Sequence, residues 1–147
     1  MAISRGVGDR RTEGGILSGL GTAYLGRGRT HQAIEFLEQS LATAREIGYR
    51  QGEGASLGNL GLAYRDLGNY RRAIEFYEQH MAIAREIGDR QGEGTALLNA
   101  ALAFNAVGAR GEAIGRMKAA AEIFAEIESP YIEQARAWLA TWQGGSG

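Results

Sequence analysis

The sequence repeats itself with a period of 40 residues. A triplet that begins with glycine and ends with arginine returns at this spacing as Gly8-Asp9-Arg10, Gly48-Tyr49-Arg50 and Gly88-Asp89-Arg90. The units 8–47 and 48–87 share roughly half of their aligned residues, and the unit 88–127 keeps the frame with more changes. Such a period is typical of proteins built from stacked supersecondary units, each of which contacts only its neighbours.

The apolar residues inside each unit are spaced as in two amphipathic α-helices. In the middle unit one helix face is marked at i, i+3, i+4 and i+7 by Leu57, Leu60, Gly61 and Tyr64. After a short turn over 66–69, a second stripe consists of Ala73, Phe76, Tyr77, Met81, Ala84 and Ile87. Two such helices form an antiparallel hairpin, which buries both stripes only by stacking on further hairpins. The sequence therefore predicts an all-α solenoid.

The order of small and large residues in these units resembles the tetratricopeptide repeat (TPR). The landmarks of the middle unit are Leu57, Leu60, Gly61, Tyr64, Gly68, Ala73 and Tyr77. The same places hold Leu17, Leu20, Gly21, Tyr24, Gly28, Ala33 and Leu37 in the first unit, and Leu97, Ala100, Ala101, Phe104, Gly108, Ala113 and Met117 in the third. The resemblance implies a right-handed α-solenoid of three TPR helix-turn-helix hairpins: TPR 1 at 8–47, TPR 2 at 48–87 and TPR 3 at 88–127.

Two features distinguish these units from the usual repeat of ~34 residues. Arg45 and Arg85 stand where the family has a helix-ending proline, so the second helix is expected to continue to Ile47 in the first unit. The resulting 40-residue unit is similar to the long TPRs of bacterial signalling and scaffold proteins. HEAT and armadillo repeats have comparable lengths, but the order of the landmarks favours TPR.

The two ends of the chain depart from the repeat. Residues 1–7 align with part of the second helix of the middle unit, and we interpret them as the remnant of a second helix from a preceding repeat. Residues 130–142 are expected to form a helix that caps the last hydrophobic face; an adhesive patch at Trp138 and Trp142 is the alternative. Residues 143–147 are interpreted as a flexible tail. Because no equivalent cap precedes the first unit, we interpret the chain as the C-terminal fragment of a longer array.

The composition restricts the possible functions. Sixteen Lys+Arg and 17 Asp+Glu leave a formal charge of -1, which does not supply the basic surface that a nucleic acid requires. The absence of cysteine excludes disulfides and thiolate ligands. The sequence contains neither a signal peptide nor the ~18 consecutive apolar residues that cross a membrane. We therefore expect a cytoplasmic protein without a nucleic-acid or membrane partner.

No constellation of residues favours catalysis. The carboxylates recur with the repeat, as on solvated helix faces, and His31 and His80 lack the convergent partners of a metal or proton-transfer site. We expect neither enzyme activity nor a cofactor nor a bound metal. The hairpin junctions contain the recurring residues Arg10, Arg50 and Arg90, near Asp9 and Asp89. We expect these arginines to form ion pairs at the junctions; an anion-binding site is the alternative.

Glycines inside the helices are expected to mark close contacts, because each costs roughly 1 kcal/mol relative to alanine. Gly61 is expected where the two helices of a hairpin cross. The glycines that open the first helices are expected to contact the preceding long helix, a frayed helix start being the alternative; they are Gly52, Gly54, Gly92 and Gly94.

In TPR proteins the first helices line a concave groove in which a peptide lies, and the resemblance implies the same here. The expected groove residues are Ser18, Thr22, Asn59, Leu62, Arg65, Leu98, Asn99, Leu102 and Asn105. Asn59 and Asn99 each offer a donor and an acceptor, which an unpaired peptide bond needs; alternatively they face solvent or hold neighbouring helices in register. Arg65 is the only cation of the set, which argues against a receptor for a C-terminal carboxylate.

Two functions are compatible with this sequence. The first is a protein-protein interaction module that binds a peptide or a partner domain in the groove, as part of a larger scaffold or signalling protein. The alternative is a self-associating or engineered solenoid whose main partner is another copy of the chain, bound through the uncapped N-terminal edge.

Overall fold

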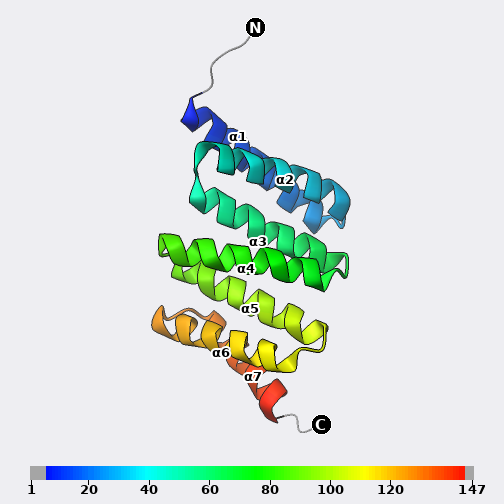
Figure 1. Cartoon of the computed structure of the whole chain (residues 1–147), viewed down its shortest axis with the longest axis vertical. Coiled ribbons are helices and arrows are strands. Elements are labelled where there is room, and N and C mark those ends of the chain that lie inside the picture. The colour runs from blue at the N-terminus through cyan, green and yellow to red at the C-terminus, as the bar shows by residue number, and fades with distance from the viewer. Residues whose placement is uncertain (1–5, 145–147) are drawn as a thin grey trace.

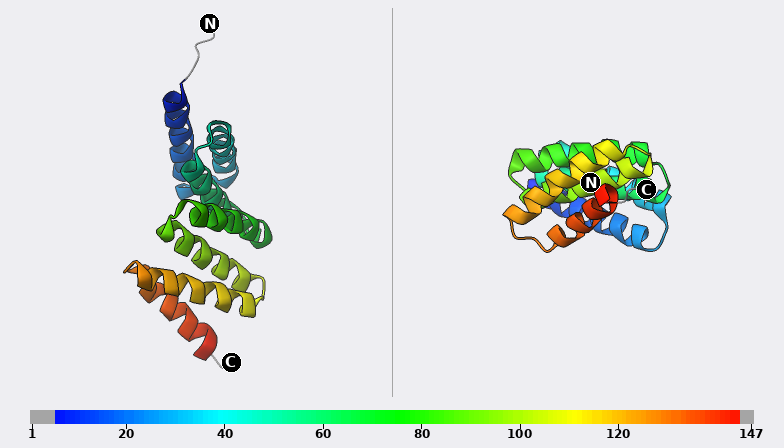
Figure 2. Two further views of the ribbon diagram at one scale, coloured as in Figure 1. Left: turned by 60° about the vertical axis from the view of Figure 1, so that its left-hand side comes forward. Right: turned by 90° about the horizontal axis from the view of Figure 1, so that it is seen from below.

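The described part of the chain, residues 6–144 of a computed structural model, contains seven α-helices and no strand (Figure 1). They are α1 (Val7–Gly26), α2 (Thr30–Ile47), α3 (Arg50–Asp66), α4 (Tyr70–Ile87), α5 (Arg90–Ala106), α6 (Arg110–Glu126) and α7 (Tyr131–Gly144). The helices stack in chain order along the long axis, so that α1 and α7 lie at opposite ends of the molecule (Figures 1 and 2). The all-α helical-repeat fold predicted from the sequence is confirmed.

Glycines in the left-handed conformation end the long second helices. Gly48 follows α2 with φ 68° and Gly88 follows α4 with φ 73°. The next amide, that of Tyr49, donates to the carbonyl of Ala44 at 2.8 Å, which satisfies a carbonyl of the last turn. A helix end of this kind needs no proline, so α2 and α4 extend to Ile47 and Ile87 as expected.

Small residues on the first helices allow the second helices to approach closely. A Cβ added to Gly61 would lie 2.6 Å from Cδ1 of Tyr77, which is fully buried on α4. The first hairpin has Gly21 against Leu37 at the equivalent positions. Each hairpin therefore balances a small residue on one helix with a large residue on the other.

The glycines that open α3 and α5 also make close contacts, but not with the preceding helix. A Cβ on Gly54 would meet Ile83 at 3.3 Å, and one on Gly94 would meet Phe124 at 2.6 Å. Ile83 and Phe124 belong to the second helix of the same hairpin, so the sequence prediction named the wrong partner. Gly52 and Gly92 lie against the residues that precede their helices, Tyr49 and Asp89.

The two ends differ in how their apolar faces are covered. At the C-terminal end α7 packs on α6, with Ala135 and Trp142 buried in the cluster around Met117. This helix continues to Gly144, so Gln143 and Gly144 belong to it and not to the tail. At the N-terminal end α1 begins at Val7, and the proposed helix remnant at 1–7 falls almost entirely outside the described residues. Within residues 6–144 no helix is long and apolar enough to cross a bilayer.

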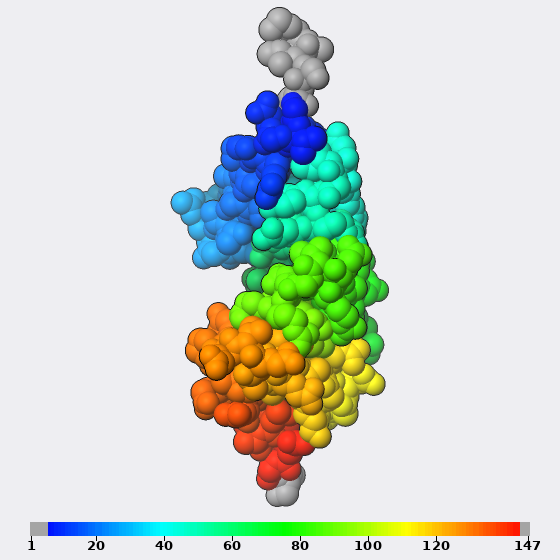
Figure 3. Space-filling model, turned by 90° about the vertical axis from the view of Figure 1, so that its left-hand side faces the viewer, coloured from blue at the N-terminus to red at the C-terminus, as the bar shows by residue number. Residues whose placement is uncertain are grey.

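The space-filling view shows an elongated molecule with an indented outline. The hollow lies between the first hairpin, in blue, and the C-terminal part of the stack, in orange (Figure 3). An indented flank of this kind gives the stack a surface on which a partner contacts more than one repeat.

Candidate functional site

The predicted groove residues lie on the three first helices, α1, α3 and α5. Six of them are partly buried: Ser18, Asn59, Leu62, Asn99, Leu102 and Asn105. Thr22 and Arg65 are exposed, whereas Leu98 belongs to the hydrophobic core with 7% of its surface accessible. Leu98 therefore contributes mainly to packing, and the other positions form the accessible part of the set.

Several polar groups in this set already have partners. The Thr22 hydroxyl donates to its own helix, and Arg65 pairs with Asp66 at 3.1 Å. The Asn105 side-chain oxygen accepts a hydrogen bond from Arg110 at 2.8 Å. In contrast, the side-chain amides of Asn59 and Asn99 form no hydrogen bond with any described residue. These two amides are therefore available to a ligand.

Three cavities open between helices at positions related by the repeat. The first has a volume of about 250 Å³ and lies between α1, α2 and α3. The second, of about 130 Å³, is lined by α3, α4 and the residue before α5, and the third, of about 180 Å³, by α5, α6 and α7. Predicted groove residues line two of them: Ser18 the first, and Leu98 and Asn99 the third.

The first cavity is larger than the second because its walls carry smaller side chains. At three pairs of positions 40 residues apart, the first cavity has the smaller side chain. These positions hold Gly15, Ser40 and Thr43 in the first cavity and Ala55, His80 and Ile83 in the second. The Ser40 hydroxyl donates to the carbonyl of Gly14 at 2.9 Å, which holds it against the cavity wall.

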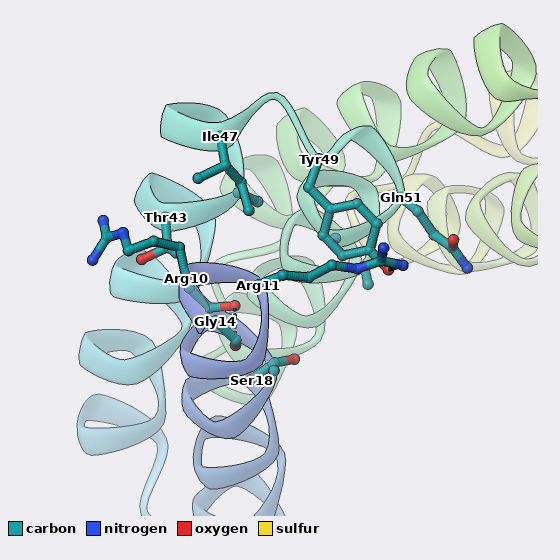
Figure 4. Close-up of a pocket in the computed structure, with 13 residues that line it drawn as sticks. Arg10, Arg11, Gly14, Ser18, Thr43, Ile47, Tyr49 and Gln51 are labelled. Atoms are coloured by element: carbon teal, nitrogen blue, oxygen red, sulfur yellow. Dashed lines mark hydrogen bonds between the residues drawn. The ribbon is translucent and has the colours of Figure 1, made fainter. Parts of the chain in front are cut away.

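Arg11 lies across the first cavity. Its guanidinium stacks over the Tyr49 ring, with Cζ 4.0 Å from the ring centroid, and Nη2 is 2.9 Å from the Tyr49 hydroxyl (Figure 4). Arg10 points away from this pair and is bound to Glu46 and Glu13. Arg11 forms no ion pair with a described residue, so its positive charge is uncompensated.

The junction arginines hold neighbouring helices together. Arg50 donates to both carboxylate oxygens of Glu86, at 2.7 and 2.9 Å, and to Glu53 at 2.7 Å. Arg45 also reaches Glu53, which is 7% exposed. The same arrangement recurs 40 residues later around Glu93. The expected ion pairs are present, but their partners are glutamates, and Asp89 instead caps α5 by accepting from the Gly92 amide.

His80 is the only partly buried histidine among the described residues. Its Nδ1 is buried without a hydrogen-bond partner in residues 6–144 and faces Gly58. Burial lowers the pKa of His80, and the nearby negative charge of Asp89 opposes that effect. The described residues contain no cluster of three or more histidine or carboxylate side chains suited to a metal ion.

A protein-family model identifies the family to which this sequence belongs. The tetratricopeptide repeat model matches residues 12–86 and, in an overlapping second match, residues 54–126. The chain belongs to the tetratricopeptide repeat family. No curated protein matches it in sequence.

Solved structures with the same TPR-like fold include proteins longer than this chain. The apo form of RapI superposes with a TM-score of 0.88 at 15% identity, over 93% of this chain and 38% of RapI. Aspartyl phosphate phosphatase F from Bacillus subtilis gives 0.86 at 20% identity, over 91% of this chain and 36% of the phosphatase. A third structure is of a protein from Podosopora anserina described as a kinesin light chain, whose own TPR-like repeats are nearly identical to one another. It superposes with a TM-score of 0.73 at 25% identity, over 86% of this chain and 63% of that protein. The TPR chain thus spans less than two fifths of the first two proteins.

Two residues that line the first cavity of this TPR array, Arg11 and Tyr49, are absent from the groove residues predicted from the sequence. A signal for them was present in the repeat alignment. Arg11 is replaced by Gln51 one unit later, and Tyr49 is replaced by Asp89. Because the two units are otherwise similar, these changes in charge could have identified the first junction as chemically different from the second.

Proposed function

We propose that this TPR chain is an interaction module that binds an extended peptide segment of a partner protein along its first helices. The observation that carries the proposal is the pair of unengaged amides at Asn59 and Asn99, one repeat apart on α3 and α5. An asparagine amide offers a donor and an acceptor together, which matches a peptide bond of an extended chain. Leu62 and Leu102, partly buried on the same helices, supply apolar surface beside them.

A structural neighbour supports this proposal by analogy. A Rap protein with this fold was crystallised in complex with competence and sporulation factor; it superposes with a TM-score of 0.81 at 18% identity, over 91% of this chain and 38% of the Rap protein. At that identity the likeness concerns the fold, so the ligand of the present chain follows from its own residues. We expect the module to act in the cytoplasm, as part of a larger scaffold or signalling protein.

Peptide selection tests the groove directly. Peptides from a displayed random library are selected on the immobilised chain and measured by fluorescence polarisation against the wild type and an Asn59→Ala/Asn99→Ala double variant. We expect about tenfold weaker binding by the double variant, since each lost hydrogen bond contributes about 0.5–1.5 kcal/mol. The matched control, Gln39→Ala/Gln79→Ala, removes two exposed amides one repeat apart from the second helices and leaves the affinity unchanged. Equal affinity of the wild type and the asparagine variant would refute the groove.

The exposed face of α1 favours self-association as a second candidate function. Ile16 and Leu20 are 60% and 40% exposed, whereas the equivalent residues of α3, Ser56 and Leu60, are buried against α2. The occupant that we propose for this face is α1 of a second copy, related by a twofold axis. Light scattering after size exclusion is expected to show a dimer that Ile16→Gln disrupts. A wild-type chain that stays monomeric at millimolar concentration would eliminate this candidate.

A further inference from the structure

The first and second cavities occupy equivalent junctions but differ in their charge. In the second cavity Asp89 supplies a carboxylate, which accepts a hydrogen bond from the Gly92 amide at 2.9 Å and caps α5. The equivalent residue at the first cavity is Tyr49, which has no carboxylate. Helix α3 accordingly begins without a side-chain cap. The first junction thus lacks the negative group that the second junction contains.

The surrounding charges make the first cavity attractive to an anion. No carboxylate is among the described residues that line it. Glu13 and Glu46, next in sequence to lining residues, are bound to Arg10, and Glu53 in the first turn of α3 is bound to Arg45 and Arg50. Arg11 is left without an ion pair and lies at the cavity, where the second junction has the neutral Gln51. The N-terminal turn of α3, which also lines the cavity, adds the positive end of a helix dipole. One uncompensated cation and one uncapped helix therefore face the same space.

We infer that the first cavity receives an acidic side chain of the bound peptide, with the carboxylate on Arg11. This inference rests on the proposed groove function and names one residue class of its ligand. Arg11 has donors left after its bond to Tyr49, and a planar guanidinium suits a carboxylate in two-point contact. The apolar walls, formed by Ala44, Ile47 and Ala55, suit the methylene groups of a glutamate. The volume of about 250 Å³ accommodates one such side chain.

A small probe tests the cavity independently of any peptide. N-acetylglutamate N-methylamide is titrated into the 15N-labelled chain, with N-acetylglutamine N-methylamide as its neutral counterpart. Saturable shifts are expected at the amides of Gly14, Gly15 and Gly52 with the acid alone. Gly54, in the second cavity, is expected to stay unchanged because Asp89 already places a negative charge there. Equal shifts with both probes, or no shift with either, would overturn the inference.

Three variants separate the cavity from a general charge effect. Arg11→Gln and Tyr49→Asp introduce the residues found at the second junction, so each is compatible with the fold. Each is expected to lower the affinity for the acid probe at least about tenfold. The control is Arg27→Gln, which removes an exposed arginine that is absent from the cavity lining and is expected to change nothing. Equal weakening by Arg27→Gln would show that overall charge, and not the cavity, attracts the acid.

The library peptides then distinguish the two proposals. Each selected peptide is resynthesised with its acidic residue replaced by the corresponding amide. The inference predicts that this replacement and Arg11→Gln each weaken binding about tenfold and that their combination is no weaker than either. Peptides that depend on Asn59 and Asn99 but ignore Arg11 would refute the acidic subsite and leave the groove intact. A response of the acid probe without any groove-dependent peptide would refute the groove.

Discussion

Gly61→Ala tests whether the crossing of α3 and α4 depends on the absence of a side chain. The new Cβ would lie 2.6 Å from Cδ1 and 3.1 Å from Cζ of Tyr77. Carbon atoms do not approach so closely, and Tyr77 is fully buried, so its ring cannot swing into solvent. Overpacking of a dense core costs typically about 1–3 kcal/mol, whereas glycine to alanine inside a helix gains about 1 kcal/mol. Because this contact is severe, we expect a net loss of about 2 kcal/mol.

The measurement is the free energy of unfolding from guanidinium titration followed by circular dichroism. The matched control is Gly115→Ala in α6, where a Cβ would meet nothing within 4 Å. This control is expected to gain about 1 kcal/mol, because only helix propensity changes. A Gly61→Ala variant as stable as this control would refute the packing argument.

The third hairpin suggests a second substitution that compensates for Gly61→Ala. It has Ala101 and Met117 at the positions of Gly61 and Tyr77, and both are fully buried. Tyr77→Met alone is expected to destabilise the chain by about 1–3 kcal/mol through lost packing. In the double variant Gly61→Ala/Tyr77→Met the alanine fills part of the space that the ring vacates. The stability loss of the double variant should therefore be smaller than the sum of the two single losses by at least about 1 kcal/mol. Losses that add within about 0.5 kcal/mol would show that the two positions do not interact.

Two further predictions concern buried polar groups. Because burial holds the pKa of His80 below its ordinary value of 6.5, the unfolded chain binds a proton that the folded chain does not, and stability falls as the pH drops below about 6.5. His80→Ser, which copies Ser40, should flatten the stability-pH curve between pH 7.5 and 5; an unchanged slope would contradict this assignment. Glu93→Gln should cost about 1–3 kcal/mol in the same denaturation assay, since a side chain 5% exposed loses charge-assisted bonds from two arginines. Glu133→Gln, at an exposed pair, should cost less than about 0.5 kcal/mol, and equal losses at both sites would rule out the effect of burial.

The helices were predictable because the information that forms them is local. The spacing of Leu57, Leu60 and Tyr64 defines one face of a helix within two turns. Gly48 ends α2 through its own left-handed φ, so the boundary is also encoded in a few neighbouring residues. The repeat then multiplies each local signal, and this is why both the hairpins and their stacking follow from the sequence.

Contacts between helices were less predictable, because they depend on which side chain is long enough to reach. The sequence predicted junction ion pairs for the recurring arginines, near Asp9 and Asp89, but the guanidinium of Arg50 spans the hairpin to Glu86, which is 36 residues distant. Leu98 shares the register of Ser18, yet it is buried, because a leucine at that position joins the hydrophobic cluster that contains Phe124. Register alone therefore identifies a face of the helix but not the depth of each side chain.

The repeat itself separates residues that every hairpin needs from residues that distinguish one junction from the next. Gly48 and Gly88, which recur, end helices in the left-handed conformation, and Arg50 and Arg90, which also recur, form the same ion pairs with Glu53 and Glu93. The register of a particular ligand must come from positions where the units differ, since recurring residues such as Asn59 and Asn99 offer the same site in each unit. Arg11 against Gln51, and Tyr49 against Asp89, are such differences at one junction, and they give that junction the opposite charge. An acidic residue anchored there would set the register in which the rest of the peptide meets Asn59 and Asn99.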